Sequence, residues 1–142
     1  MAETTVVIPN WNGRHLLGRC LTALQAQTYQ DFDIVVVDNG STDGSVAYLC
    51  EHFPDVRIIA NEENRGFAAA TNQGIRAPGG PRAGRFVATL NNDTEVDPGW
   101  LAALVDAMET EMESAPGVGM CASAMLFAHC PEMINSAGIA VD

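Results

Sequence analysis

The chain repeats one local pattern three times: an apolar run, polar residues where the run ends, and then a segment with helical periodicity. The apolar runs and their polar ends are VVIPNWNG at residues 6–13, IVVVDNGSTDGS at 34–45 and FVATLNNDTEVD at 86–97. Unbroken apolar runs are typical of parallel strands that helices cover on both faces. Alternating strands and helices predict a doubly wound α/β sheet with right-handed crossovers. Polar residues at the carboxyl ends of such strands are expected to meet at one crevice.

The pattern also predicts where the elements lie. We expect strands at residues 5–9, 34–37, 56–60 and 86–90, and a further strand in the segment VGMCASAMLFA that begins at residue 118. The first helix is expected to begin at Asn12 or Gly13, the third at residues 67–76, and the last after Asp97. Ser41 or Thr42 is expected to cap the second helix, with Asp43 favourable near its positive end.

Composition and charge narrow the class of protein. At 142 residues, 47% of them hydrophobic and 18% charged, the chain is expected to form one globular domain, residues 1–142. A net charge of −11 argues against nucleic acid as a partner. No apolar run reaches the roughly 20 residues that span a bilayer, and the start of the chain has no basic signal region. These features favour a cytoplasmic location.

Cysteine and histidine spacing gives no sign of a zinc or disulfide framework. Of the cysteines at positions 20, 50, 121 and 130, Cys20 and Cys50 are predicted to be reduced core residues of helices. The three histidines lie on different predicted elements and are expected at the surface.

Taken in order, the three motifs and NRGFAAATNQG at residues 64–74 resemble the nucleotide-sugar-binding half of family 2 glycosyltransferases with the GT-A fold. The closest resemblance is to rhamnosyltransferase-like members, and it covers residues 5 to about 100. It implies a mostly parallel, Rossmann-like sheet flanked by helices. It also implies inverting, metal-assisted transfer of a sugar from a nucleotide diphosphate donor, of the dTDP-rhamnose or UDP-sugar type, to a glycan or lipid-linked acceptor in polysaccharide assembly.

The resemblance implies a nucleotide-sugar site made of the polar and turn residues of these motifs. Its predicted members are Pro9, Asn10, Trp11, Asn12, Asp38, Asn64, Arg65, Gly66, Asn72, Asn91 and Asn92. Structural alternatives stay open for several of them. Trp11 could serve packing, Asp38 could hold the NGST turn through backbone amides, and Arg65 could be a solvated loop residue. Asn39, Gly40 and Ser41 are interpreted as turn geometry.

Asp93 is the predicted metal ligand. Residues 91–93 occupy the position of the family's DXD motif, but Asn91 replaces the first acidic residue. One carboxylate is chemically sufficient, because Mg²⁺ takes one or two protein carboxylates together with waters and substrate phosphates, and Mn²⁺ accepts similar oxygen ligands. The alternative is that Asp93 only caps the turn before Glu95 and Asp97.

No residue of the chain stands out as the general base that an inverting transferase needs. In the family that carboxylate follows the metal segment and a further helix, so the base is expected outside this chain. We therefore expect residues 1–142 to be the N-terminal part of a longer catalytic domain, truncated before the acceptor-binding half. The alternative is a catalytically incomplete binding or interaction module. An open sheet edge would favour a homodimer, and peripheral contact with the inner face of the membrane is compatible with a lipid-linked acceptor.

Two other enzyme classes are disfavoured. A nicotinamide dehydrogenase would need G-x-G-x-x-G between the first strand and its helix, and WNGRHLLG offers no such loop. The glycine-rich, basic phosphate loop of a sugar nucleotidyltransferase is absent from the same place.

Overall fold

The computed structural model describes residues 2–77, 85–114 and 119–136. The chain divides into two compact units, Met1–Pro98 and Gly99–Asp142. The first unit contains all three repeats of the strand, polar end and helix pattern except the last helix.

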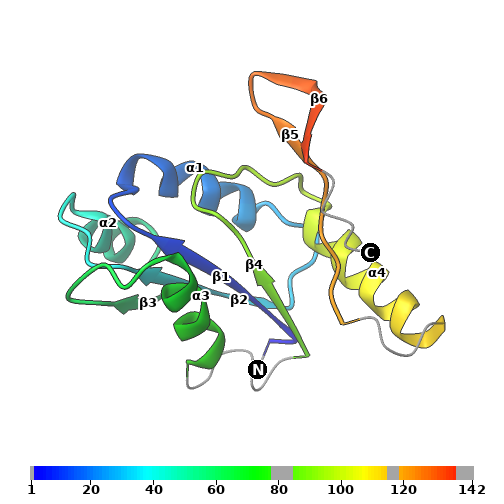
Figure 1. Cartoon of the computed structure of the whole chain (residues 1–142), viewed down its shortest axis with the longest axis horizontal. Helices are drawn as coiled ribbons and strands as arrows, with labels where there is room; N and C mark the ends of the chain where they lie inside the picture. Colours follow the sequence, from blue (N-terminus) through cyan, green and yellow to red (C-terminus); the bar gives the residue numbers. More distant parts are fainter. Residues whose placement is uncertain (1, 78–84, 115–118, 137–142) are drawn as a thin grey trace. The chain divides into compact units, whose positions relative to one another are not determined.

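The first unit is a parallel sheet with helices between its strands (Figure 1). Its elements are β1 (Thr4–Asn10), α1 (Arg14–Gln25), β2 (Phe32–Asp38), α2 (Ser45–His52), β3 (Arg57–Ala60), α3 (Phe67–Arg76) and β4 (Phe86–Thr89). The strand order is β3-β2-β1-β4, and every neighbouring pair is parallel. The predicted fold class is thereby confirmed.

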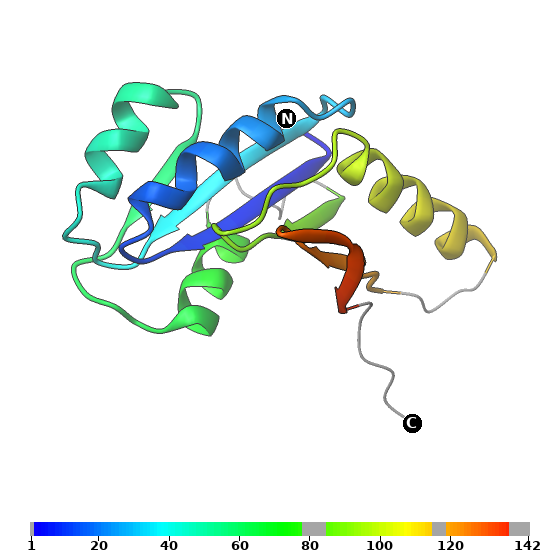
Figure 2. The same ribbon diagram turned by 90° about the horizontal axis from the view of Figure 1, so that it is seen from above.

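The core of this unit lies around β1, which is hydrogen-bonded to β2 on one side and to β4 on the other. Val6, Val7 and Ile8 are each 0% exposed, because α1 and α2 cover one face of the sheet and α3 covers the other (Figure 2). Double-sided burial explains why the strand sequence is continuously apolar rather than alternating.

Helix α3 approaches the sheet closely because its inner positions are small. Ala70 packs on Val7, Val35 and Val37, and a Cβ atom at Gly74 would clash with the side chain of Val7. The alanine-rich sequence predicts this close packing, and the glycine makes it possible.

Helix α2 begins later than the sequence suggests. Neither Ser41 nor Thr42 caps it, since the residue before its first turn is Gly44, with φ of 84°. Asp43 instead supplies the cap: its Oδ1 accepts hydrogen bonds from the backbone N–H of Ser45 at 3.0 Å and from the Ser45 hydroxyl at 2.6 Å. Its Oδ2 accepts the first backbone N–H of α1, that of Arg14, at 2.9 Å. One carboxylate thus caps two helices.

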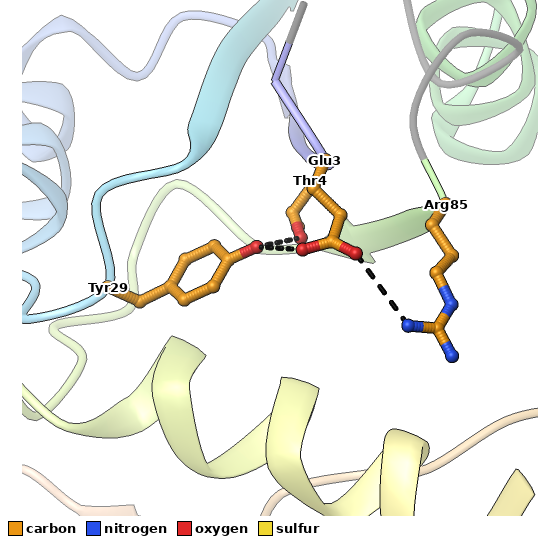
Figure 3. Close-up of polar contacts among 4 residues, drawn as sticks. All are labelled: Glu3, Thr4, Tyr29 and Arg85. Atoms are coloured by element: carbon orange, nitrogen blue, oxygen red, sulfur yellow. Dashed lines mark hydrogen bonds and ion pairs between the residues drawn. The ribbon is translucent and has the colours of Figure 1, made fainter.

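A polar cluster of Glu3, Thr4, Tyr29 and Arg85 links chain segments at the amino-terminal edge of the sheet, where the strands begin (Figure 3). The Tyr29 hydroxyl donates to Glu3 Oε2 at 3.0 Å and lies 3.4 Å from Thr4 Oγ1, while Arg85 Nη1 lies 3.7 Å from Glu3 Oε1. Burial, together with the hydrogen bond from Tyr29 to Glu3 and the negative charges of Glu3 and Asp31, raises the pKa of Tyr29. The cluster joins the start of β1 to the start of β4 and to the loop before β2.

The second unit consists of α4 (Trp100–Ser114) and an antiparallel hairpin of β5 (Met125–Phe127) and β6 (Cys130–Ser136). The helix expected after Asp97 therefore begins at Trp100. The strand expected from residue 118 begins only at Met125, and residue 118 itself lies outside the described residues. Within the described ranges, no helix is both long and apolar enough to cross a membrane.

The cysteines divide differently from the prediction. All four are free thiols, and Cys20 is a buried residue of α1 as expected, but Cys50 is exposed. The prediction for Cys50 was wrong because α2 has only eight residues, and its buried positions are Ser45 and Leu49.

Candidate functional site

The polar strand ends meet at a cleft on the carboxyl edge of the sheet. The order of the strands reverses beside β1, since the chain moves from β1 to β2 and β3 and then crosses back to β4. Such switch points are where open α/β sheets bind ligands. A cleft of about 340 Å³ lies here, lined by Pro9, Asn10, Trp11, Asn39, Asn64, Phe67, Asn91, Asn92 and Asp93.

Most of the predicted site residues line this cleft, and some do not. Asn12, Asp38, Arg65, Gly66 and Asn72 are not among its lining residues in the described part of the chain. Asn39 and Phe67 line it without having been predicted as ligand contacts. Phe67 is 62% exposed and Trp11 is 57% exposed, so the cleft carries two accessible aromatic rings.

Asn10 is the centre of the polar network that shapes the cleft. It is 2% exposed, and its Nδ2 donates to Asp38 Oδ1 at 2.9 Å and to Ser41 Oγ at 3.3 Å. Its Oδ1 accepts a hydrogen bond from Asn92 Nδ2 at 2.8 Å. One amide therefore joins the ends of β1 and β2 to the segment that follows β4.

Gly13 leaves room for this network. A Cβ atom at Gly13 would collide with the side-chain amides of Asn92 and Asn10. Asn12, just before it, has a positive φ of 50° and accepts a hydrogen bond at Oδ1 from the backbone N–H of Thr42 at 2.8 Å. Asn12 therefore holds the turn after β2, at the edge of the cleft.

Asp38 holds the turn that follows β2. It is 1% exposed, and its Oδ2 accepts the backbone N–H of Ser41 at 3.0 Å while Oδ1 accepts the Asn10 amide. The structural alternative for Asp38 is therefore realised. Carboxylate oxygens have further lone pairs, so a contact with the base or ribose stays a prediction.

Asn39 fastens the loop that precedes α3. Its backbone N–H donates to the Asn10 carbonyl at 2.7 Å, its Nδ2 donates to Asn64 Oδ1 at 2.8 Å, and its Oδ1 accepts the backbone N–H of Arg65 at 3.0 Å. It is 4% exposed. A buried side-chain amide needs hydrogen-bond partners for its N–H groups and its oxygen. The position of Asn39 directly after an apolar strand is therefore the sequence signal that could have distinguished it from an ordinary turn residue.

Arg65 and Asn72 lie apart from the cleft lining. The Arg65 side chain is exposed, and among the described residues its guanidinium pairs with no carboxylate. Asn72 is an exposed residue of α3. Gly66, with φ of 86°, gives the loop the backbone conformation that leads into α3.

The carboxylate of Asp93 forms no hydrogen bond or ion pair with any other described residue. It is exposed in the cleft, and no hydrogen bond or ion pair engages it within residues 2–77, 85–114 and 119–136. The nearby Glu95 is different, because its Oε1 lies 3.4 Å from Arg19 Nη1. Burial, and then the negative charge of Asp93, raise the pKa of the Cys20 thiol to about 12. Cys20 therefore stays protonated beneath this segment, 3.7 Å from the Asn91 carbonyl to which its thiol donates.

The oxygen-bearing side chains of the cleft fit a hard divalent cation whose remaining ligands come from outside the chain. The described residues contain no group of three or more His, Cys, Asp or Glu side chains that could hold a metal alone. Asp93 and Asn91 line the cleft, and both carry side-chain oxygens. Mg²⁺ and Mn²⁺ accept this chemistry when waters and phosphates complete the shell.

The sequence matches the family model described as glycosyl transferase family 2 over residues 5–122, which includes every residue of the cleft. The chain belongs to glycosyl transferase family 2. This confirms the resemblance on which the site residues were predicted.

Two curated relatives illustrate the family's range. The chain is 32% identical over 117 residues to the uncharacterized glycosyltransferase YibD of Escherichia coli, covering 80% of this chain and 33% of that protein. It is 32% identical over 102 residues to an N-acetylglucosaminyl-diphospho-decaprenol L-rhamnosyltransferase of Mycobacterium tuberculosis, covering 67% of this chain and 33% of that protein. The family 2 chain thus spans about a third of the length of these relatives.

Solved structures share the fold. A mannosyltransferase from Pyrobaculum calidifontis, in complex with GDP-Man and Mn²⁺, aligns with a TM-score of 0.61 and 29% identity over 82% of this chain and 34% of that one. Residues 1–349 of Staphylococcus aureus TarS, in complex with UDP, align with a TM-score of 0.64 and 21% identity over 87% of this chain and 39% of that one. The second likeness concerns the fold alone.

Proposed function

We propose that this chain supplies the donor-binding half of a glycosyltransferase, which binds a nucleotide diphosphate sugar together with Mg²⁺ or Mn²⁺ in the carboxyl-edge cleft. The carboxylate of Asp93, which lines that cleft and is engaged by no other residue of the described ranges, carries the proposal. Asp93 would hold the cation, which would offset the negative charge of the leaving nucleotide. The P. calidifontis relative, solved in complex with GDP-Man and Mn²⁺, supports a nucleotide sugar and a divalent cation as the ligands.

The rest of the donor has plausible partners around the cleft. Trp11 and Phe67 offer exposed rings for the base, and Asn64 lines the cleft wall with an amide for base or ribose. Asp38, which does not line the cleft, stays the predicted contact to base or ribose. Arg65, which does not line the cleft, stays a predicted phosphate contact. The family membership and the M. tuberculosis relative support a donor of the dTDP-rhamnose or UDP-sugar type and a glycan or lipid-linked acceptor.

The same cleft favours a second proposal, that this chain alone binds the donor without efficient transfer. Asp93 is its only carboxylate among the described lining residues, and we assign that group to the metal. An inverting reaction needs a separate base for the acceptor hydroxyl. We therefore expect metal-dependent nucleotide binding by this chain and sugar transfer only by a longer form that adds a base.

A thermal-shift panel tests the binding proposal. UDP, dTDP and GDP are each added with Mg²⁺, with Mn²⁺ or with EDTA, since a ligand that binds only the folded state raises the Tm. We expect one nucleotide to stabilise the chain only when the metal is present. Asp93→Ala should abolish this stabilisation. Glu62→Gln, which removes an exposed carboxylate outside the cleft lining, should retain it. Equal metal-dependent shifts in both variants would contradict the assignment of Asp93.

A further inference from the structure

A second hollow, of about 660 Å³, lies between α1 and α2 and shares no lining residue with the cleft. It is lined by Arg14, His15, Gly18, Arg19, Asp43 and Tyr48, and is called the α1–α2 groove here. The absence of a side chain at Gly18 makes room for the Tyr48 ring, because a Cβ atom at Gly18 would lie 2.7 Å from the Tyr48 hydroxyl oxygen. The family assignment gives this groove no role.

The α1–α2 groove gathers positive charge in an otherwise acidic chain. The chain has a net charge of −11 and only seven Lys and Arg residues, all arginines, yet Arg14 and Arg19 both line this one surface, with His15 beside them. The Arg14 guanidinium lies 5.7 Å from the centre of the Tyr48 ring. A guanidinium above a ring still presents N–H donors along its edge, where a planar pair of oxyanion oxygens can bind.

The acidic residue of the groove is already engaged. Both carboxylate oxygens of Asp43 accept hydrogen bonds from the helix starts at Arg14 and Ser45. Burial alone would raise the pKa of Asp43, but the hydrogen bonds from Ser45 and from backbone amides outweigh it and keep the pKa below its usual value. Among the described residues, no carboxylate lies within ion-pair distance of the Arg14 guanidinium.

Arg19 has a partner that a ligand could replace. Its Nη1 lies 3.4 Å from Glu95 Oε1, and the two side chains are 80% and 60% exposed. Ion pairs this exposed contribute little, because water and salt screen them. A phosphate in the groove would accept hydrogen bonds from the Arg19 guanidinium in place of Glu95, because charge-assisted hydrogen bonds to phosphate are strong.

We propose that the α1–α2 groove is a second anion site, which binds the phosphate group of a small organic phosphate through Arg14 and Arg19, with the organic part against Tyr48. His15 adds a further polar contact at the groove wall. The ligand of this site is separate from the nucleotide sugar proposed for the cleft and needs no metal.

Backbone amide NMR of the chain tests this proposal in EDTA, which removes any metal-held ligand from the cleft. Inorganic phosphate and phenyl phosphate are the two probes. We expect both to shift the amide resonances of residues 14–19 and 45–48 saturably, with phenyl phosphate binding more tightly because its ring contacts Tyr48. Equal affinity for both probes would contradict the role of Tyr48.

Variants separate specific binding from general charge. Arg14→Gln with Arg19→Gln should weaken phenyl phosphate binding about tenfold or more, whereas Glu95→Gln should tighten it about two- to fivefold by freeing Arg19. The matched control is Arg57→Gln with Arg76→Gln, which removes two arginines that do not line the groove. Should the first helix unfold in the double variant, Arg19→Gln alone tests the same prediction.

Three results would overturn the proposal. One is the absence of saturable shifts in residues 14–19 and 45–48. Another is an equal loss of binding in the Arg57 and Arg76 control. The third is a pattern of shifts confined to residues 10–11 and 91–93, which would place the phosphate in the cleft instead.

Discussion

At the scale of single residues, Asn10 does the most to hold the cleft together. Its one buried amide contacts Asp38 and Ser41 on one side and Asn92 on the other. Removing it would leave the buried Asp38 carboxylate with one donor fewer. A buried charged group that loses a hydrogen bond is costly to the folded state.

We therefore expect Asn10→Ala to lower the free energy of unfolding by about 1–3 kcal/mol, measured by urea denaturation at neutral pH. It should also abolish nucleotide-dependent stabilisation. Asn72→Ala removes an exposed amide from α3 and serves as the control for stability. A loss below about 0.5 kcal/mol in the free energy of unfolding of Asn10→Ala would contradict the stabilising role given to Asn10.

A methyl group at Gly13 should disturb the same network from its other side. Gly13→Ala would push against Asn92 and Asn10, so we expect about 1–3 kcal/mol of destabilisation and weaker nucleotide binding. Gly119→Ala is the matched control, since a Cβ atom there meets nothing within 4 Å. Similar unfolding midpoints for the two variants would argue against the crowding at Gly13.

Cys20 should be chemically silent in the folded chain. Its pKa of about 12 leaves almost no thiolate at pH 8, and the residue is buried, whereas Cys50 and Cys121 are exposed. Iodoacetamide at pH 8 should alkylate Cys50 and Cys121 first, with Cys20 modified only after denaturation, as read by mass spectrometry. Fast labelling of Cys20 in the folded chain would contradict the burial of the segment above it.

At the scale of elements, the start of two helices depends on Asp43. We expect Asp43→Ala to cost about 1–2 kcal/mol, because the first amides of both α1 and α2 lose their acceptor. The folded-state pKa is lowered, so this contribution is present above the ordinary aspartate pKa of about 4 and is lost as pH falls through the folded value. Urea titrations across acid pH should show a shallower decline for Asp43→Ala than for the parent.

The polar cluster around Tyr29 at the amino-terminal edge of the sheet should make the stability of the fold depend on alkaline pH. A raised folded-state pKa means that stability is present below the ordinary tyrosine pKa of about 10 and is lost as pH rises from there through the folded value. Tyr29→Phe should remove this alkaline decline, because Phe has no hydroxyl to ionise. Tyr48→Phe is the control. Identical alkaline profiles for Tyr29→Phe and the parent would contradict the role given to Tyr29.

Elements with strong hydrophobic patterns could be predicted from the sequence, whereas local competition between capping groups could not. Continuous valine and isoleucine runs indicate β1 and β2 because both faces of the sheet are covered. Ser41 and Thr42 resemble caps in the sequence, but the fold brings the Asp43 carboxylate to both helix starts. Phe67 was missed because an aromatic residue at the start of a helix is usually a packing residue, and only tertiary structure shows it exposed beside the cleft.

At the scale of the whole molecule, exposed apolar side chains favour self-association. Leu126, Met133 and Ile134 of the β5–β6 hairpin are 52%, 56% and 63% exposed. Surfaces of this kind commonly mark contacts with other chains. We expect sedimentation velocity to show concentration-dependent dimers, and Ile134→Lys to shift them toward monomer. Val87→Lys, on the edge strand β4, tests the alternative that the sheet edge forms the contact. Monomers alone at high concentration would contradict both contacts.

The position of β1 has a consequence for biosynthesis. Its partners are β2, which follows after one helix, and β4, which begins at Phe86. During translation this buried strand of the nascent chain therefore keeps one hydrogen-bonding side vacant until more than half of the sequence has left the ribosome. Distant pairings of this kind slow folding and leave strands open to wrong partners. Newly made chains should accordingly depend on ribosome-associated chaperones until β4 emerges.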